Sequence, residues 1–494
     1  MSVRLTLAKN GNLKVRTVAV VKKGDHEEIF RVARNKLKLK KPASRLFDQE
    51  GHEISLAQVP ALLNDSLLVV SCGEDFVGVV KDDAADSSSA SSSSVLETSQ
   101  NRDVVVTILA KASWIDDEAV QQLHTVAKTL PGMKIAAGMP DLHAGRTFPV
   151  GASFVTEGRI YPPLIGTDIG CGMSLYQTDL PGSSKPGKLV GQLHGLEGPW
   201  TGDTTAWLKE REVEPTAHDA SLGTIGGGNH FAELQSVEAV VHEGHFADLG
   251  LSQNHLYLLV HSGSRGYGEA VLNDHLAAHG TAGLDQDTDP ALAYLRGHEH
   301  ACSWAKASRE LIAHRTMTQI NTTGRKILDV WHNNVVLKVS KLWKIAPCVF
   351  FLHLSFSSSF LQKFENGEHY WVHRKGAAPS DQGPVVIPGS RGSFSYLVMP
   401  TGDREVSAYS LAHGAGRKWT RTKALSKMKE RFHHPSQLQE TDLGSQVICE
   451  DPELIYEEAP PAYKNVEEII EDLKDSGLVE VIAIFRPVVT YKTR

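Results

Sequence analysis

Residues 165–173 read IGTDIGCGM, a glycine-rich turn that carries two potential metal ligands. Asp168 and Cys171 stand three residues apart within it. A hard carboxylate beside a soft thiolate suits a borderline metal ion such as Mn²⁺, Zn²⁺ or Co²⁺. The glycines would let the backbone approach the ion closely. A buried structural cysteine is the alternative interpretation.

Two further glycine-flanked motifs carry histidines. GTIGGGNHFAEL, residues 223–234, places three glycines before Asn229 and His230, and such loops expose backbone N–H groups that can cradle a phosphate. VHSGSRGYG, residues 260–268, follows the apolar run LYLLV. We expect this run to be a strand that ends at His261, a well-oriented metal ligand, with Arg265 suited to a phosphate. A plain glycine loop with a surface histidine is the alternative for the first motif.

The second half of the chain adds three clusters. WHNN occupies residues 331–334, and RKGAAP, residues 374–379, leads into VVIPGSRGSFSY. SLAHGAGRKWTR, residues 410–421, contains His413 followed by small residues, which leave room for a bulky group on the imidazole. Seven basic residues lie between Arg417 and Arg431 and form a local basic patch. One carboxylate, one thiolate and several histidines among phosphate-cradling loops together predict a metal-dependent phosphate chemistry.

The composition sets the broad class of the protein. The chain has 494 residues, 41% of them hydrophobic and 22% charged, which is typical of a globular protein. Global disorder, a collagen-like fibre and a disulfide-stapled small domain are excluded. The formal net charge of −7 shows no global basicity, so nucleic-acid binding needs a local basic patch.

The cysteines and the apolar runs bear on the compartment. The cysteines are few and scattered, which favours a reducing compartment, so we expect a cytoplasmic or nuclear protein: Cys72, Cys171, Cys302, Cys348 and Cys449. The first 16 residues contain no apolar run typical of a secretory signal. No apolar stretch approaches the roughly 20 residues that span a bilayer, so no membrane partner is expected.

Three parts are predicted along the chain. Residues 1–80 show a strand–strand–helix–strand–strand order that resembles a small ubiquitin-like β-grasp module. Its basic stretch, residues 31–45, is either a solvated helix face or a docking patch for an unknown protein partner. Residues 81–102 contain DSSSASSSS and are expected to be a disordered linker. Residues 103–494 alternate helical and strand patterns and are expected to form one large catalytic unit.

One segment of the large unit looks foreign. Residues 339–362, VSKLWKIAPCVFFLHLSFSSSFLQ, are apolar and follow neither a helical nor a strand period. A buried strand or helix is one interpretation. The other is an insertion or a translated intron, because Val–Ser can be encoded by the splice donor GTGAGT and Leu–Gln by the acceptor YTGCAG. Its 24 residues preserve the reading frame, and sequencing the transcript would test the hypothesis.

In this order, these motifs resemble those of the RtcB RNA ligases: MPDLHAGRTFPVG, GTDIGCGM, GGGNHF, HSGSRG, HN, RKGA, PGSRGSFSY and HGAGR. The resemblance covers about residues 104–494, and SWIDDEAVQQL and GRIYPPLIG are closest to the branch associated with release factor H. It implies an α+β fold with central β-sheets and surrounding helices. It also implies an enzyme that joins RNA 3′-phosphate or 2′,3′-cyclic phosphate ends to 5′-hydroxyl ends with GTP and Mn²⁺, in RNA repair or tRNA splicing.

The resemblance also implies roles for individual residues. Five residues match the ligands of a two-manganese site, with the cysteine bridging: Asp168, Cys171, His230, His261 and His332. His413 matches the catalytic nucleophile that becomes guanylylated. Residues that match nucleotide-contacting positions are Asn229, His230, Phe231, Ala232, Glu233, His332, Asn333, Pro388, Gly389, Ser390, Arg391, Ser395, His413, Gly414, Ala415, Gly416 and Lys492. The family usually ends in a short lysine–glycine tail, where this chain has TYKTR.

Two other functions remain open from the sequence. A di-metal phosphoesterase acting on RNA ends would keep the metals and lack the nucleotide step, although His413 in an intact HGAGR motif argues against it. A non-catalytic RNA-binding protein would need no ordered metal site. Labelling with GTP would separate the first from a ligase, and measured manganese content would separate the second.

Overall fold

The computed structural model describes residues 2–76 with short gaps, 104–339 and 369–493. The chain divides into two compact units, Met1–Leu96 and Glu97–Arg494, and each is described by itself. The predicted linker, residues 81–102, lies outside the described residues. So does the apolar segment 339–362, apart from its first residue.

Within its described residues, the N-terminal unit forms a four-stranded sheet and one helix. Its elements are β1 (Ser2–Lys9), β2 (Asn12–Lys22), α1 (His26–Lys36), β3 (Arg45–Phe47) and β4 (Ser66–Ser71). The strand order is β2-β1-β4-β3, and β1 runs parallel to β4. Ile29 and Ala33 of α1 pack against Leu5 and Leu7 of β1. The likeness of this unit to a β-grasp module stays a prediction.

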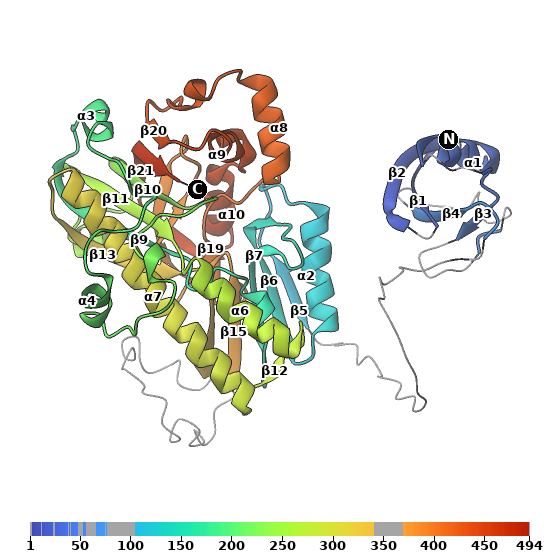
Figure 1. Cartoon of the computed structure of the whole chain (residues 1–494), viewed down its shortest axis with the longest axis horizontal. Helices are drawn as coiled ribbons and strands as arrows, with labels where there is room; N and C mark the ends of the chain where they lie inside the picture. The colour runs from blue at the N-terminus through green and yellow to red at the C-terminus, as the bar shows by residue number, and fades with distance from the viewer. Residues whose placement is uncertain are drawn as a thin grey trace. The chain divides into compact units, whose positions relative to one another are not determined.

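An eight-stranded sheet forms the centre of the larger unit (Figure 1), with the order β13-β9-β11-β10-β21-β18-β17 and β20 paired to β21. All of its pairs are antiparallel except β20 with β21. The strands are β9 (Gly172–Pro181), β10 (Phe231–Val240), β11 (His255–Ser262), β13 (Gly324–Trp331), β17 (Val385–Pro388), β18 (Ser395–Pro400), β20 (Gln446–Cys449) and β21 (Val479–Lys492).

A second sheet of five strands has the order β14-β15-β7-β6-β5. The strands are β5 (Val105–Ile108), β6 (Met133–His143), β7 (Val150–Thr156), β14 (Asn333–Val339) and β15 (His369–Lys375). Two short pairs complete the strands: β8 (Arg159–Ile160) with β12 (Leu284–Asp285), and β16 (Ala377–Pro379) with β19 (Ser410–Ala412).

The two large sheets share the main hydrophobic core. Met139 of β6 and Val372 of β15 belong to the same buried cluster as Leu259 of β11 and Leu397 of β18. Burial of this apolar surface is the principal force that holds the sheets together. The two sheets meet at His332, because β13 of the larger sheet continues through this one residue into β14 of the smaller sheet.

Helices cover the outer faces of the sheets. Helix α2 (Asp117–Thr129) packs Leu123 and Val126 on the five-stranded sheet. The 31-residue α7 (Asp289–Gln319) packs Ile312 against Leu258 of β11, on the other face of the larger sheet (Figure 1). Mixed sheets with surrounding helices confirm the predicted α+β class.

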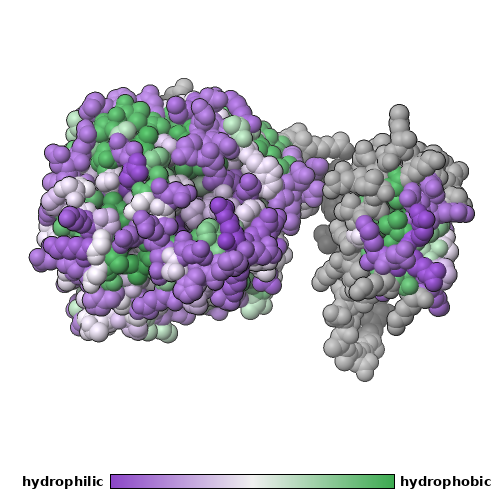
Figure 2. All heavy atoms as spheres, turned by 90° about the horizontal axis from the view of Figure 1, so that it is seen from above, coloured by the Kyte–Doolittle hydropathy of each residue, from purple (hydrophilic) through white to green (hydrophobic). Residues whose placement is uncertain are grey.

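Shorter helices occupy the connections. They are α3 (Pro186–Val190), α4 (Thr204–Lys209), α5 (Glu243–Asp248), α6 (Gly266–His279), α8 (Arg421–Arg431), α9 (Leu454–Glu457), α10 (Val466–Asp475) and the 3₁₀ helices η2 (Pro162–Leu164), η3 (Asp219–Ser221), η5 (Pro435–Leu438) and η6 (Pro460–Ala462). Hydrophilic residues cover most of the larger unit's face in Figure 2, with hydrophobic areas between them. Within the described ranges, no helix combines the length and apolar character needed to cross a bilayer.

Candidate active site

Three potential metal ligands lie at the ends of adjacent strands. Cys171 directly precedes β9, His261 is the penultimate residue of β11, and His332 directly follows β13. Gly172 of β9 pairs with Ser262 on one side and with Trp331 on the other, so His261 lies opposite Met173, and His332 stands one residue beyond the Trp331 pair, beside Cys171. Side chains alternate along a strand, so residues two positions apart share a face. All three therefore lie on the face that buries Met173, Leu259 and Val330 between the sheets.

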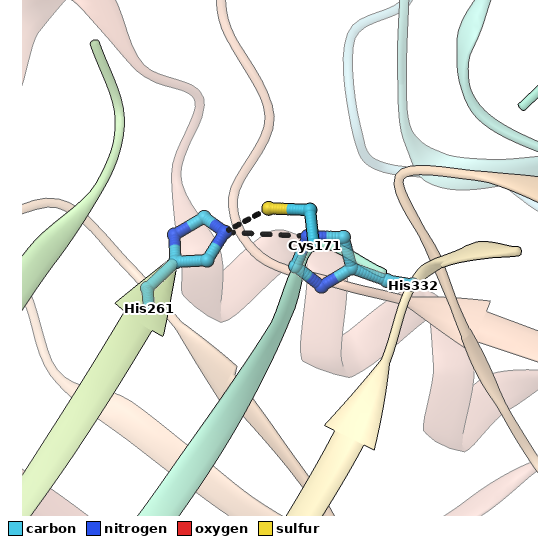
Figure 3. A group of neighbouring side chains, drawn as sticks. All are labelled: Cys171, His261 and His332. Atoms are coloured by element: carbon cyan, nitrogen blue, oxygen red, sulfur yellow. Dashed lines mark hydrogen bonds between the residues drawn. The ribbon is translucent and has the colours of Figure 1, made fainter. Parts of the chain in front are cut away.

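These side chains point toward one another (Figure 3). The Cys171 Sγ lies 3.3 Å from the Nε2 of His261, and that nitrogen lies 3.2 Å from the Nε2 of His332. Asp168 and His230 form a second group with the same thiol. The Nε2 of His230 lies 3.3 Å from the Cys171 Sγ and 2.9 Å from the Oδ2 of Asp168. In each group all ligand atoms lie within 4.8 Å of one another, and Cys171 belongs to both.

The environment of the cluster favours a bound cation. Burial lowers the pKa of His261 and of His332 well below the usual range, so both imidazoles are neutral and keep a lone pair. Burial and the Asp168 carboxylate raise the pKa of the Cys171 thiol well above its usual value. Burial alone would raise the pKa of Asp168, but His230 and Arg265 outweigh it and lower that pKa. A thiolate at this depth thus needs positive charge beside it.

His413 lies next to this cluster and is held by a buried carboxylate. It follows β19, and its ring centre lies 4.7 Å from that of His332. The Nδ1 of His413 lies 2.7 Å from the Oδ2 of Asp141 on β6, and its backbone N–H donates to the same oxygen at 3.3 Å. Asp141 is fully buried. A proton on Nδ1 satisfies this contact, which leaves the Nε2 lone pair of His413 free.

Asp141 had no role assigned from the sequence. It lies within the motif MPDLHAGRTFPVG, which marked the resemblance but offered no local pattern pointing to a histidine 272 positions later. The signal that could have found it is chemical. A nucleophilic histidine needs a partner for its second nitrogen, and a motif aspartate supplies one.

Two arginines approach the predicted phosphate-cradling loop. Gly226 and Gly228 have φ angles of +89° and +73°, which favour glycine. A Cβ at Gly226 would lie 1.7 Å from the Nη1 of Arg265, and one at Gly228 would lie 2.3 Å from the Nη2 of Arg421. The absence of side chains in this loop therefore makes room for the two guanidinium groups.

A cavity of about 350 Å³ joins the cluster, His413 and most predicted nucleotide contacts. The predicted residues that line it are Asp168, Cys171, Asn229, Phe231, Glu233, His261, His332, Asn333, Pro388, Gly389, Ser390, Arg391, His413, Gly414, Ala415, Gly416 and Lys492. His230, Ala232 and Ser395 are not among its lining residues. The side chain of Ala232 belongs to the core on the opposite face of the sheet.

One end of the cavity presents both an acceptor and a donor. Burial raises the pKa of Glu233 to about 7, and its carboxylate accepts hydrogen bonds from Thr490 (2.6 Å) and Gln235 (2.7 Å). Gln235 also donates to the Ser395 hydroxyl at 2.8 Å, which ties Ser395 to this end indirectly. The Nζ of Lys492 donates to the His230 carbonyl at 2.9 Å, and burial lowers the pKa of Lys492 to about 8.

Several lining residues were not assigned a role from the sequence. Arg417 donates to the buried Glu458 at 2.8 Å, and the Tyr463 hydroxyl donates to the same carboxylate. Lys375 also lines the cavity, and burial lowers its pKa to about 8. Arg417 and Lys375 lie in the quoted HGAGR and RKGA motifs, whereas Glu458 and Tyr463 stand in no motif.

Comparison with known proteins identifies the family. Residues 122–194 and 195–493 match the family model described as tRNA-splicing ligase RtcB. RNA-splicing ligase RtcB2 of an Escherichia coli strain is 43% identical over 395 residues, covering 79% of this chain and 96% of the relative. RNA-splicing ligase RtcB of Escherichia coli K12 is 29% identical over 430 residues (78% and 97%), and tRNA-splicing ligase RtcB of Archaeoglobus fulgidus is 28% identical over 454 residues (76% and 90%). On both the matched length and the identity, this chain belongs to the RtcB family of RNA-splicing ligases.

Proposed function

We propose that this RNA ligase joins RNA 3′-phosphate or 2′,3′-cyclic phosphate ends to 5′-hydroxyl ends, with GTP and Mn²⁺, in RNA repair or tRNA splicing. The observation that carries the proposal is the place of His413. A histidine with one nitrogen held by buried Asp141 and the other free lies beside a shared-thiolate ligand cluster. Both line one cavity. That arrangement suits attack on a phosphorus atom.

The first step would attach GMP to His413. The free Nε2 attacks the α-phosphorus of GTP, an N–P bond forms, and the bond to pyrophosphate breaks. The attacking imidazole becomes positively charged as the bond forms, and the Asp141 carboxylate at 2.7 Å stabilises that charge. Arg421 lines the cavity beside the glycine loop and can offset negative charge on phosphate groups, whereas Arg265 does not line it and donates to the Nδ1 of His230 at 3.1 Å.

The metal ligands would be Asp168, Cys171, His230, His261 and His332. One carboxylate, one thiolate and neutral imidazoles suit a borderline divalent ion, and the thiolate common to both groups suits a bridge between two ions. When bound, Mn²⁺ would supply positive charge to the phosphates and lower the pKa of a hydroxyl nucleophile. The same donors also suit Zn²⁺. Metal content must therefore be measured for both.

Guanine selectivity follows from the acceptor–donor pair at the cavity end. Guanine presents N–H donors at N1 and N2 beside the O6 acceptor. The Glu233 carboxylate can accept from the donors, and the Lys492 ammonium can donate to O6. Adenine carries an acceptor at N1 and a donor at its 6-amino group, so it would mismatch both residues. We therefore infer that GTP is the nucleotide and ATP is not.

Sealing would then take two displacements. An oxygen of the RNA 3′-phosphate attacks the phosphorus of the histidine-bound GMP, and His413 leaves with its lone pair restored. The 5′-hydroxyl next releases its proton to solvent water, its oxygen bonds to the phosphorus of the activated 3′-phosphate, and the bond from that phosphate to GMP breaks. A cyclic phosphate would first be hydrolysed to the 3′-phosphate. Lys375 lines the cavity, and burial lowers its pKa only to about 8, so it keeps charge at neutral pH to hold an RNA phosphate.

The test is labelling followed by ligation. The protein is incubated with Mn²⁺ and α-labelled GTP, and the acid-labile adduct is measured before an RNA pair with 3′-phosphate and 5′-hydroxyl ends is added. The unmodified chain should form the adduct and join the RNA, and His413→Ala should do neither while it retains its metal. His124→Ala, at an exposed position on α2, is the matched control. A chain that processes the ends without any adduct would instead be a phosphoesterase.

A further inference from the structure

Lys464 connects the loop of His413 to the strand of Asp141. It lies between η6 and α10 and is 8% exposed. Its backbone N–H donates to the carbonyl of Gly416, three residues after His413, at 3.0 Å. Its side-chain Nζ donates to the carbonyls of Leu142 at 2.6 Å and Pro140 at 3.2 Å, the residues on either side of Asp141. Lys464 thus bonds both to the backbone of the loop that follows His413 and to the backbone on either side of Asp141.

The orientation of the Asp141 carboxylate depends on the backbone of residues 140–142. Its Oδ2 contacts His413, whereas its Oδ1 has no hydrogen-bond partner among the described residues although it is buried. No second side chain within these ranges therefore fixes the rotation of the carboxylate. The nucleophile loop, residues 413–416, also packs closely against β6: a Cβ at Gly416 would lie only 2.3 Å from the Asp141 carbonyl oxygen. Small shifts in the backbone of residues 140–142 would therefore move the Asp141 carboxylate relative to the Nδ1 of His413.

The surroundings of Lys464 favour a charged side chain that stays bonded to the Pro140 and Leu142 carbonyls. A buried ammonium is costly unless its hydrogens find acceptors, and two carbonyls supply them. Among the neighbouring carboxylates, Asp141 contributes most to stabilising the Lys464 ammonium. The positive charge reciprocally stabilises the buried Asp141 carboxylate, which His413 needs as an acceptor. The position is also outside the cavity, since Lys464 is not among its lining residues.

We propose that Lys464 is a positioning residue for guanylylation: its ammonium holds the Pro140 and Leu142 carbonyls, so that the Asp141 carboxylate stays aimed at the Nδ1 of His413. The inference rests on the proposed function. Removal of the ammonium should slow formation of the histidine–GMP bond. It should leave GTP affinity and metal binding close to normal, because Glu233, Lys492 and the metal ligands keep their own contacts.

The experiment compares Lys464→Met with a matched variant, Lys111→Met. The Nζ of Lys111 donates to the carbonyl of Asp475, the last residue of α10, at 3.1 Å, and Lys111 does not line the cavity. It therefore controls for the loss of a lysine that bonds to a backbone carbonyl in the same region. Single-turnover guanylylation of the full chain is measured with labelled GTP and Mn²⁺ across GTP concentrations. The maximal rate of Lys464→Met should fall about 10- to 100-fold, with the half-saturating GTP concentration within about threefold of normal.

The outcomes separate the two proposals. If the unmodified chain forms no adduct, the proposed function fails, irrespective of Lys464. If it labels and Lys464→Met labels as fast as Lys111→Met, the positioning role is wrong. Should the methionine variant not fold, Lys464→Gln keeps a donor group on a shorter stem and should show an intermediate rate. A glutamine variant at the unmodified rate would likewise overturn the inference.

Discussion

Deletion of residues 339–362 should stabilise the larger unit, because the flanking strands already end together. In the antiparallel pair β14–β15, Lys338 lies opposite Tyr370 and Val339 opposite His369. Deletion joins Lys338 to Lys363, which takes the place of Val339 opposite His369. Phe364 then falls opposite Glu368, and Glu365–Asn366–Gly367 remains as a three-residue loop.

That loop has the composition that a tight hairpin requires. Three-residue hairpin loops usually consist of a type I turn followed by a left-handed residue, and glycine is preferred at that last position. Gly367 would occupy it. The pairing of Lys338 with Tyr370 is outside the deletion, so the side chains of β14 and β15 before and after it keep their faces of the sheet. A foreign segment would be expected to leave behind such a ready-made turn.

The expected gain can be worked out from loop closure. The connection between Lys338 and Tyr370 shortens from 31 to 7 residues, slightly more than two halvings. At about 0.6 kcal/mol for each halving, the free energy of unfolding should rise by about 1.3 kcal/mol. For a unit of this size the melting temperature should increase by roughly 2 °C. Loss of the apolar sequence IAPCVFFLHLSF should also raise soluble yield.

The assay compares the 494-residue chain with the shortened one for soluble yield, melting temperature and GMP labelling. Gly367→Val in the shortened chain is the control, because a β-branched residue at a left-handed position should cancel about 1 kcal/mol or more of the gain. A shortened chain that melts lower and labels less would show that the segment is a structural part of the enzyme. The insertion or intron hypothesis would then be abandoned.

Three other predictions follow from the site. Cys171→Ala should lose both metal ions, whereas His332→Ala should lose mainly one, because of these two residues only Cys171 belongs to both ligand groups. Two manganese ions per chain in the cysteine variant, measured by elemental analysis, would contradict a bridging role for the Cys171 thiolate. A chain lacking residues 1–102 should ligate a short RNA at close to the normal rate, since every site residue lies after them; loss of turnover would place the N-terminal unit in the reaction. The affinity for GTP should weaken as the pH falls below about 7, because burial raises the pKa of Glu233 to about 7 and protonation removes the charge of its carboxylate. Equilibrium binding that gives the same affinity at every pH from 6 to 8 would contradict this role.

The candidate metal ligands could be chosen from the sequence because each lies in a short local motif, Asp168 and Cys171 in the same one. Glycines beside Cys171 and His230, and an apolar run before His261, mark strand ends and close turns through short-range rules. Alternation along the strands then explains why these side chains share one face. The β-grasp likeness of the first unit and the origin of residues 339–362 are still predictions from pattern.

Tertiary structure decided how those motifs meet. The order β13-β9-β11-β10 brings Cys171 beside a histidine 90 positions later, and the contact of Asp141 with His413 spans 272 positions. Lys464 and Glu458 stand in no motif, and only the packing of the nucleophile loop against β6 and the pocket wall gives them partners. Strand order and sheet packing depend on burial shared by the whole core. No short stretch of sequence carries that information, so these residues could be found only in the folded protein.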